Sequence, residues 1–458
     1  MAEEAGRALW ERLEAHHKAG YLSLHMPGHK ENAALAPYLA RLGAELDITE
    51  LPEFDDLHDP SGVLAQGMDR AAKLWGSRKS YFQVNGSTGG LLAAIRAATR
   101  RGDQVLVARH CHKAVYHAIE LCGLDPVFLL PPVEETFGLA GSLSPEQVAQ
   151  ALEDHPGVKL VVYPSPTYDG VVSDTAGICA TAHAKGVPVL VDEAHGAHLG
   201  FHPAFPPGAM AQGADLAVAS LHKMLPSLTQ TALLHAGGKL VPLPQVARQT
   251  GIFQSSSPSY LLMASMDGCV RLLEEKGEAL FAAWHRRLTE FDPAKILIST
   301  QGTGLTGVAL RDLLRREYRI EVEMALDHYV LAMTGLGTDD AMPARLAQAL
   351  LAIDETCASS EETPSVLAVP GALPPRRCSL EEAAQAPGGL SFLYDAMGKV
   401  CGEYIWAYPP VIPLIAPGEE ITPPLVETVE GLYRAGVRLI GTRGKPPFTT
   451  FALGDQDG

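Results

Sequence analysis

The sequence predicts an α/β fold built on a mostly parallel sheet, and three observations lead to this expectation. Strand-like apolar runs alternate with helical patterns from about residue 81 to residue 234. Several of these runs, such as VKLVVYP and VPVLVD, are short and mostly apolar, as strands buried on both faces are. Polar residues follow the runs repeatedly, at the ends where open α/β sheets bind their ligands. We therefore expect a sheet that is covered by helices on both faces.

The composition indicates a large globular protein and excludes some functions. The chain has 458 residues, of which 47% are hydrophobic and 19% charged, which is enough for a large core and two or three domains. Its formal net charge is −17, and no block of Lys and Arg interrupts the chain. A nucleic acid or an anionic membrane is therefore not the expected partner.

Neither a secretion signal nor a membrane span is visible. The first twenty residues carry acids and two adjacent histidines but no apolar core, and the apolar runs are strand-sized. The seven cysteines show no CxxC spacing, which argues against a zinc site and a disulfide framework. We expect a cytoplasmic protein with reduced thiols and no bound metal.

Changes of pattern along the chain predict four parts. Residues 1–66 form an N-terminal helix and an arm rich in Pro, Gly and acidic residues, with a short strand over 21–26. Residues 67–290 form the large α/β domain, and residues 291–355 form a small α+β domain. A segment rich in Pro, Ser and Thr then opens a C-terminal domain over residues 356–458.

The run NGSTGG at residues 85–90 lies between an apolar strand and an alanine-rich helix. Small residues allow a ligand to approach the backbone closely, and the amides at the start of a helix attract anions. The hydroxyl groups of Ser87 and Thr88 can add hydrogen bonds. The pattern indicates a phosphate site, although ordinary helix capping by Ser or Thr also produces such turns.

Two histidines, His110 and His112, join the next strand to its helix. Side chains at i and i+2 on an irregular turn seldom converge on a metal without further ligands. A flat imidazole at the carboxyl end of a strand is suited to stack on an aromatic cofactor ring. The alternative for His110 is a helix cap that is bonded to the backbone.

Asp192 and Lys223 each come directly after an apolar run. A lysine at such a place, preceded by Ser220 and His222, is suited to form a Schiff base with an aldehyde cofactor. A carboxylate at a strand end can pair with a protonated pyridine nitrogen. Taken singly, such a lysine is more often a side chain that reaches from a strand end into solvent, and such an aspartate is more often a cap. Together with the glycine-rich turn, they indicate pyridoxal phosphate.

With these residues assembled, the chain resembles the fold type I pyridoxal-phosphate decarboxylases of ornithine, lysine and arginine, in the short form without an N-terminal wing domain. The resemblance spans nearly the whole chain. It is carried by LHMPGHK, DITEL with DDLHDPSG, FQVNGSTGG, RHCHKAV, SPTYDGVVSD, DEAHGAHLGFHP, ASLHKMLPSLTQ, SSPSY, and YPP followed by IPLIAPGE.

The resemblance implies a role for each matching residue. Lys223 would bind pyridoxal phosphate covalently, and Asp192 would pair with its ring nitrogen. The phosphate would be bound at two turns, by Gly86, Ser87, Thr88, Ser220 and His222. The residues near the ring would be His112, Thr167 and His195. The serine cluster 255–257, with Ser256 at its centre, would reach the phosphate of a neighbouring subunit, which implies a homodimer or a higher homo-oligomer with shared active sites.

The chain departs from the family pattern at three places. Pro226 stands where a small residue is usual after the lysine, and it fixes φ and removes a donor. Val411 stands where the family has the glycine of PPGIP, so it adds bulk near the expected substrate pocket. Residues 31–32 are Glu and Asn, where glycines usually follow MPGHK. We expect the first two changes to bear on substrate specificity.

The predicted reaction is decarboxylation of arginine, lysine or ornithine to a polyamine-type amine and CO₂. The catalytic residues would be Lys223, His222, His112 and Asp192. The cationic side chain of such a substrate needs a carboxylate partner, for which the candidates are Asp55, Asp56 and Glu403. Two alternatives remain: an aminotransferase or aldolase on the same fold, and a catalytically silent assembly protein.

Overall fold

The computed structural model describes residues 7–134, 139–287, 294–326, 328–357, 372–408 and 412–454. Contacts between residues divide the chain into two compact units. The first unit comprises residues 1–98 and 188–283, and the second comprises residues 99–187 and 284–458. Val411, at which a change of specificity was expected, lies outside the described residues.

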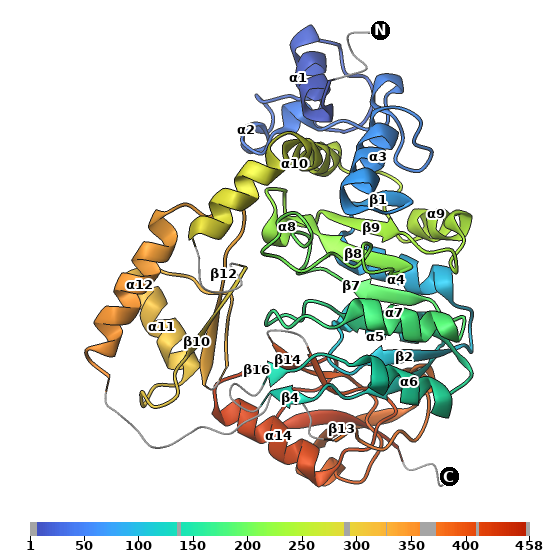
Figure 1. Cartoon of the computed structure of the whole chain (residues 1–458), viewed down its shortest axis with the longest axis vertical. Coiled ribbons are helices and arrows are strands. Elements are labelled where there is room, and N and C mark those ends of the chain that lie inside the picture. Colours follow the sequence, from blue (N-terminus) through green and yellow to red (C-terminus); the bar gives the residue numbers. More distant parts are fainter. Residues whose placement is uncertain are drawn as a thin grey trace. The chain divides into compact units, whose positions relative to one another are not determined.

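The described residues of the first unit form four strands in the order β1-β9-β8-β7. Their bounds are β1 Lys79–Gln83, β7 Val189–Asp192, β8 Leu216–Ser220 and β9 Ala232–Ala236. The β7–β8 pair is parallel, whereas β8–β9 and β1–β9 are antiparallel. Three of the four strands therefore follow the expected apolar runs, and β9 runs back along β8 (Figure 1).

Helix α4 (Gly86–Ala98) packs against β8 and β9, and α9 (Leu243–Ile252) packs on α4. A Cβ atom at Gly90 would lie 3.0 Å from Cγ1 of Val218, so the helix lies this close to β8 because glycine stands there. Helix α3 (Val63–Trp75) packs against β1. The other helices of this unit are α1 Leu9–Ala19, α2 Pro37–Ala40, η1 Ala44–Leu46, η2 Pro52–Phe54, α8 Leu221–Met224 and α10 Tyr260–Arg287.

The second unit begins with three parallel strands in the order β6-β2-β3, namely β2 Gln104–Ala108, β3 Asp125–Leu129 and β6 Val158–Pro164. Three helices alternate with them, α5 Lys113–Cys122, α6 Pro145–Asp154 and α7 Thr175–Ala184. Helix α6 begins where Ser144 accepts a hydrogen bond from the backbone of Gln147 and the Gln147 side chain accepts from the backbone of Ser144. The short pair β4 (Val133–Glu134) and β5 (Leu139–Ala140) is antiparallel.

The same unit carries a small antiparallel sheet in the order β10-β12-β11, with β10 Lys295–Ser299, β11 Met324–Ala325 and β12 Tyr329–Met333. Buried residues of α11 (Gly307–Tyr318) and α12 (Ala341–Asp354) share one apolar cluster with this sheet. This part of the chain therefore combines a small antiparallel sheet with two helices.

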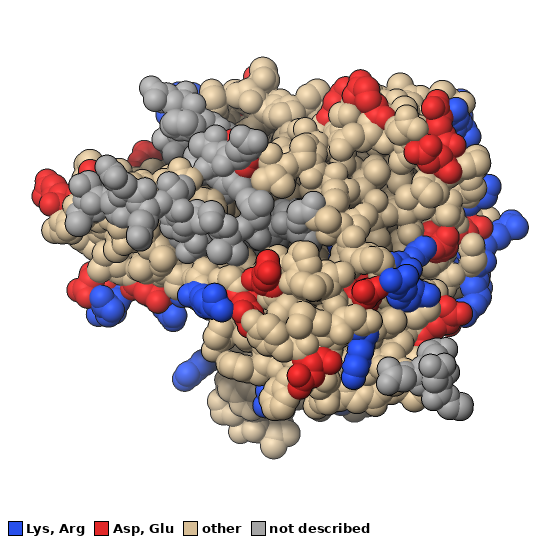
Figure 2. Space-filling model, turned by 90° about the horizontal axis from the view of Figure 1, so that it is seen from below, with Lys and Arg blue, Asp and Glu red and all other residues tan. Residues whose placement is uncertain are grey.

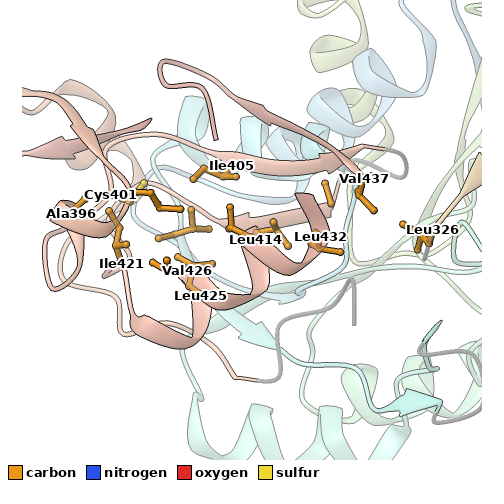
Figure 3. Close-up of a cluster of buried hydrophobic side chains, with 14 of the residues drawn as sticks. Leu326, Ala396, Cys401, Ile405, Leu414, Ile421, Leu425, Val426, Leu432 and Val437 are labelled. Carbon is orange, nitrogen blue, oxygen red and sulfur yellow. The ribbon is translucent and has the colours of Figure 1, made fainter. Parts of the chain in front are cut away.

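The C-terminal part contains a sheet in the order β15-β14-β16, with β14 Ile405–Tyr408, β15 Ile412–Ile415 and β16 Arg438–Gly441. Helix α14 (Pro423–Arg434) turns Leu425, Val426 and Leu432 toward Ile405 and Leu414 of this sheet (Figure 3). The remaining elements are α13 Leu380–Gln385, β13 Gly388–Phe392, η3 Tyr394–Ala396 and β17 Thr449–Leu453.

The predicted α/β fold with a mostly parallel sheet is confirmed, but one predicted element is wrong. Residues 21–26, all of them described, form no strand. Four large apolar side chains of this stretch, Tyr21, Leu22, Leu24 and Met26, are between 63% and 84% exposed. Alternation of apolar and polar residues makes a strand only where a neighbouring strand pairs with it, and this segment has none in the described chain.

Two further properties concern the surface and the helices. Figure 2 shows acidic and basic side chains interspersed over one face of the molecule. None of the helices in the described parts of the chain combines the length and apolar character needed to cross a bilayer.

Candidate active site

The centre of the site is the carboxyl end of the parallel strands β7 and β8, where Asp192 and Lys223 meet. Asp192 ends β7 opposite Val218, and the one-turn helix α8, which carries Lys223, begins directly after Ser220 ends β8. Because neighbouring parallel strands end at the same edge of a sheet, two residues 31 positions apart come together here. The sequence predicted this meeting correctly.

Asp192 is 5% exposed, and its Oδ1 accepts a hydrogen bond of 3.1 Å from the backbone of Ala194. Burial raises the pKa of the Asp192 carboxyl group, while the positive charge of Lys223 and the Ala194 N–H act in the opposite direction. A buried carboxylate in this position is stabilised by a cation.

His195 lies beside the lysine, with its Nε2 atom 3.0 Å from Nζ of Lys223. The imidazole is 8% exposed. When Nζ carries three protons it donates this hydrogen bond, and Nε2 of His195 is then the acceptor. The histidine thus holds the lysine side chain in one position.

The glycine-rich turn closes on the same strand end. Oγ of Ser87, in the first turn of α4, lies 2.6 Å from Oγ of Ser220. Gly86 has φ +68°, a left-handed conformation that glycine adopts without strain. Thr88 is exposed at the start of α4. Two facing hydroxyl groups and the amides of a helix N-terminus form a set of donors for an anion.

His222 follows the strand but is turned toward the backbone. Its Nδ1 atom lies 2.9 Å from the carbonyl oxygen of Thr231, which can only accept, so Nδ1 carries the proton. Burial lowers the pKa of His222; the hydrogen bond to Thr231 raises it and the charge of Lys223 lowers it further. In the neutral form of His222, Nε2 carries no proton and can only accept a hydrogen bond. Nε2 can therefore bind a phosphate oxygen only when the imidazole ring is protonated.

The structure shows how Pro226 ends the lysine-bearing turn. Leu225, directly before it, has φ −116° and ψ 156°, the extended conformation that a following proline favours. The N–H of Leu225 still donates to the carbonyl of Leu221 over 2.8 Å. The proline therefore stops α8 after one turn without breaking its hydrogen bond.

The third departure from the family pattern lies in the N-terminal arm. Glu31 has φ +53°, and the preceding Lys30 has φ +50°. Both values lie in the left-handed region, where glycine costs least. Of the two departing residues, Glu31 thus has the backbone shape that glycine would favour, with another side chain.

Two of the predicted residues belong to the second unit. His112 caps the N-terminus of α5, because its Nδ1 accepts a hydrogen bond of 3.2 Å from the N–H of Ala114. The helix cap that was considered for His110 is therefore His112. His110 is buried, and burial lowers its pKa to about 4. Thr167 is 2% exposed, and its Oγ1 accepts from the N–H of Val171 over 3.0 Å.

The serine cluster 255–257 lies in the loop before α10 and is exposed. Oγ of Ser255 accepts from the N–H of Ser257, and the carbonyl of Ser255 lies 2.8 Å from Nε2 of His58. Ser256, the predicted contact to a neighbouring subunit, is therefore at the surface of the first unit, in a loop that is held by its neighbours.

The three carboxylates considered for the substrate cation have other partners. Asp55 accepts hydrogen bonds of 2.7–3.3 Å from five backbone N–H groups, those of residues 56, 61, 62, 64 and 65. Glu403 is 1% exposed and accepts from the N–H groups of residues 443, 444 and 451 and from Oγ1 of Thr450. Asp56 accepts from the N–H of His58. Carboxylates so engaged hold loops together.

Glu193 had no signal in the sequence beyond its place after Asp192. It is 1% exposed and accepts a hydrogen bond of 2.8 Å from the N–H of Ala209. Burial raises the pKa of the Glu193 carboxyl group to about 8, and the Ala209 N–H acts in the opposite direction. A carboxyl group in this condition is mostly protonated at neutral pH.

The residues of the first unit fit pyridoxal phosphate. The amine of Lys223 suits the aldehyde carbon, the buried Asp192 suits a protonated ring nitrogen, and the hydroxyls of Ser87 and Ser220 suit the phosphate. Within the described residues, no group of three or more His, Cys, Asp and Glu side chains is placed to hold a metal ion. The site is thus organised for an organic cofactor with an aldehyde and an anionic group.

The fold agrees with this chemistry. The structure is similar to the crystal structure of the lysine decarboxylase LdcF of Francisella novicida, with a TM-score of 0.81 at 19% identity over 98% of this chain and 81% of that chain. The protein therefore has the architecture of the fold type I pyridoxal-phosphate enzymes.

Comparison with proteins of similar sequence shows to which enzyme family the chain belongs. The model of the family described as Orn/Lys/Arg decarboxylase, major domain, matches residues 8–291. An arginine decarboxylase of Halalkalibacterium halodurans is 31% identical over 473 residues, with 96% of both chains covered. The uncharacterized protein YaaO of Bacillus subtilis is 34% identical over 468 residues, with 93% of both chains covered. The chain belongs to the Orn/Lys/Arg decarboxylase family, and it is an amino-acid decarboxylase rather than an aminotransferase or an aldolase. Its cofactor, as in this family, is pyridoxal phosphate.

Proposed function

We propose that this protein decarboxylates a basic L-amino acid (arginine, lysine or ornithine) and releases CO₂ and a polyamine-type amine. The observation that carries the proposal is the convergence of Asp192, His195 and Lys223 at the ends of β7 and β8, where Nζ of Lys223 lies 3.0 Å from Nε2 of His195. The family supports the reaction. The relative named an arginine decarboxylase, which is matched over 96% of both chains, supports a basic substrate.

Each residue has a task that follows from its surroundings. Bound pyridoxal phosphate supplies an electron sink for the pair released when the bond to the substrate carboxylate breaks. Asp192 would hold a positive charge on the ring nitrogen, since a cation is what stabilises a carboxylate buried to this degree. Ser87 and Ser220 would bind the phosphate at the N-terminus of α4.

Lys223 would have two tasks, to bind the cofactor covalently and to deliver a proton to the substrate α-carbon. Its contact with His195 fits both, because the imidazole can accept a proton from Nζ or return one. Three further roles are proposed from the resemblance alone. They are ring stacking for His112, a place near the ring for Thr167, and a contact to a second subunit for Ser256.

We also propose that the active form is a homodimer. Large apolar side chains of the N-terminal arm are exposed in the single chain, among them Leu35, Tyr38 and Leu42 at 65–76%. A second apolar surface lies around Pro226 and includes Trp10 and Leu228, which are 45% and 52% exposed. Surfaces of this kind are typical of subunit interfaces. The domain bounds at residues 66, 290 and 355 and the cytoplasmic location stay predictions.

The test follows CO₂ from carboxyl-labelled arginine, lysine and ornithine, together with an acidic and an aromatic amino acid as negative substrates. We expect release from at least one basic substrate and no release with Lys223→Ala, which should also lose the visible absorbance of lysine-bound cofactor. Lys239→Ala, a change at an exposed lysine of the same unit, is the matched control and should behave as wild type. Release of CO₂ by Lys223→Ala, or release from the acidic or aromatic amino acid alone, would contradict the proposal.

A further inference from the structure

The carboxamide of Gln230 joins the segment that carries Lys223 to the glycine-rich turn. Strand β1 pairs with β9 up to Gln83, which lies opposite Ala232. Val84, the next residue, is bonded by two glutamine side chains. Its N–H donates to Oε1 of Gln254 over 2.7 Å, and its carbonyl oxygen accepts from Nε2 of Gln230 over 2.6 Å. These two carboxamides continue the hydrogen bonding of the ladder up to the turn.

The conformation of Gln230 is unusual for a residue with a side chain. Its φ is +82°, in the region that favours glycine. Glycine would relieve the backbone but could not reach Val84, and asparagine is one methylene shorter. The backbone at residue 230 is strained although glycine would remove the strain. This indicates that the side chain of Gln230 has a task.

The same short segment also holds the lysine-bearing turn. The carbonyl oxygen of Thr231, next to Gln230, accepts from the N–H of Leu221 over 3.1 Å and lies 2.9 Å from Nδ1 of His222. Two adjacent residues therefore bind two different parts of the site. Gln230 holds the turn that leads to Gly86 and Ser87, and Thr231 holds α8 with its lysine.

The turn is held closely on this side. A Cβ atom at Gly86 would lie 3.6 Å from the carbonyl oxygen of Gln230, and the side-chain amide of Asn85 donates to the carbonyl of Phe253 over 3.1 Å. Hydroxyl and amide donors bind an anion well only when their spacing is fixed beforehand. The two ends of a cofactor, one bound covalently and one bound as an anion, need the same fixed spacing.

We propose that Gln230 is a positioning residue for the cofactor: its carboxamide fixes the distance between the phosphate-binding turn and Lys223, so that both ends of pyridoxal phosphate are held together. The inference rests on the proposed cofactor site of the first unit. It adds a residue that touches neither the cofactor nor the substrate and that acts through the backbone of Val84.

The experiment compares Gln230→Glu, Gln230→Gly and wild type as holoenzymes. Glutamate keeps the shape but replaces the donor by an acceptor that faces the carbonyl of Val84, whereas glycine removes the backbone strain together with the carboxamide. The control is Gln212→Glu, because Nε2 of Gln212 likewise donates to a backbone carbonyl, that of Pro207, over 2.7 Å. The readouts are the release rate of pyridoxal phosphate after dilution, followed by its absorbance, and the melting temperature of the apoenzyme.

We expect both Gln230 variants to release the cofactor about tenfold faster or more, a change equivalent to about 1.4 kcal/mol, with an apoenzyme melting temperature close to that of wild type. Gln212→Glu should match wild type in both readouts. Release within about twofold of the wild-type rate, or an apoenzyme melting temperature that falls while release stays unchanged, would overturn the inference. A wild-type protein that binds no pyridoxal phosphate would instead overturn the proposed function.

Discussion

Replacing Glu419 by glutamine removes the partner of a guanidinium that is fully buried, and we expect a large loss of stability in the second unit. Arg109 and Glu419 are separated by 310 positions and have side chains 0% and 2% exposed. They form a two-point contact, with Nη1–Oε1 at 2.6 Å and Nη2–Oε2 at 2.8 Å. Nη2 also donates to the carbonyl of Leu414 over 3.3 Å, and Oε2 accepts from the N–H of Ala416.

The size of the expected stability loss follows from the positive charge of Arg109, which stays buried in the variant. Burial by itself lowers the pKa of Arg109, but the carboxylate of Glu419 and the neighbouring Tyr116 together outweigh burial, and the pKa stays above its ordinary value. In the Glu419→Gln variant the guanidinium is still charged and has lost its counter-charge. Leaving a buried charge uncompensated costs about 3–5 kcal/mol. For a unit of this size that corresponds to a melting temperature lower by roughly 6–20 °C.

The assay is a set of thermal melts on wild type, Glu419→Gln, Arg109→Met and the double variant Arg109→Met with Glu419→Gln. Because the double variant removes both charges, its melting temperature should lie above that of either single variant. The control is Glu420→Gln, which breaks a more exposed pair with Arg377 and should cost less than about 1 kcal/mol. A double variant whose loss equals the sum of the two single losses would refute the reasoning, as would a Glu419→Gln variant that melts with wild type.

Two further predictions concern carboxyl groups of the first unit. The pKa of Glu193 is raised from 4.5 to about 8, so its protonated form stabilises the fold fully below about pH 4.5, and this contribution is lost as the pH rises through 8. Glu193→Gln, which is neutral throughout, should therefore gain stability relative to wild type between pH 5 and pH 8, by up to ~4 kcal/mol at 1.4 kcal/mol for each pH unit; parallel melting curves across this range would contradict the assignment. Asp55→Ala removes the acceptor of five backbone N–H groups around the start of α3 and should destabilise the holoenzyme by about 1–3 kcal/mol. Asp55→Asn, which keeps one acceptor oxygen, should lose less, and a melting temperature of Asp55→Ala equal to that of wild type would show that the capping contributes nothing.

Much of the fold could be predicted because its signals are local. The apolar runs that became β2, β6, β7 and β8 carry their own pattern, and the turn at residues 85–90 marks the start of α4 by composition. The strand expected over residues 21–26 failed because pairing, which no local pattern contains, decides whether such a segment is a strand. The antiparallel course of β9 was equally invisible, since its sequence fits either direction.

The sequence by itself determined the meeting of Asp192 with Lys223, because polar residues at the ends of adjacent parallel strands must share one edge of the sheet. Only the tertiary structure decided how the remaining polar groups are used. It assigned the carboxylates of Asp55 and Glu403 to backbone N–H groups, and it made Gln230 the link to the glycine-rich turn. The physical reason is that a buried polar group must find a partner, and the nearest one is set by how distant segments pack rather than by the residues beside it in the chain.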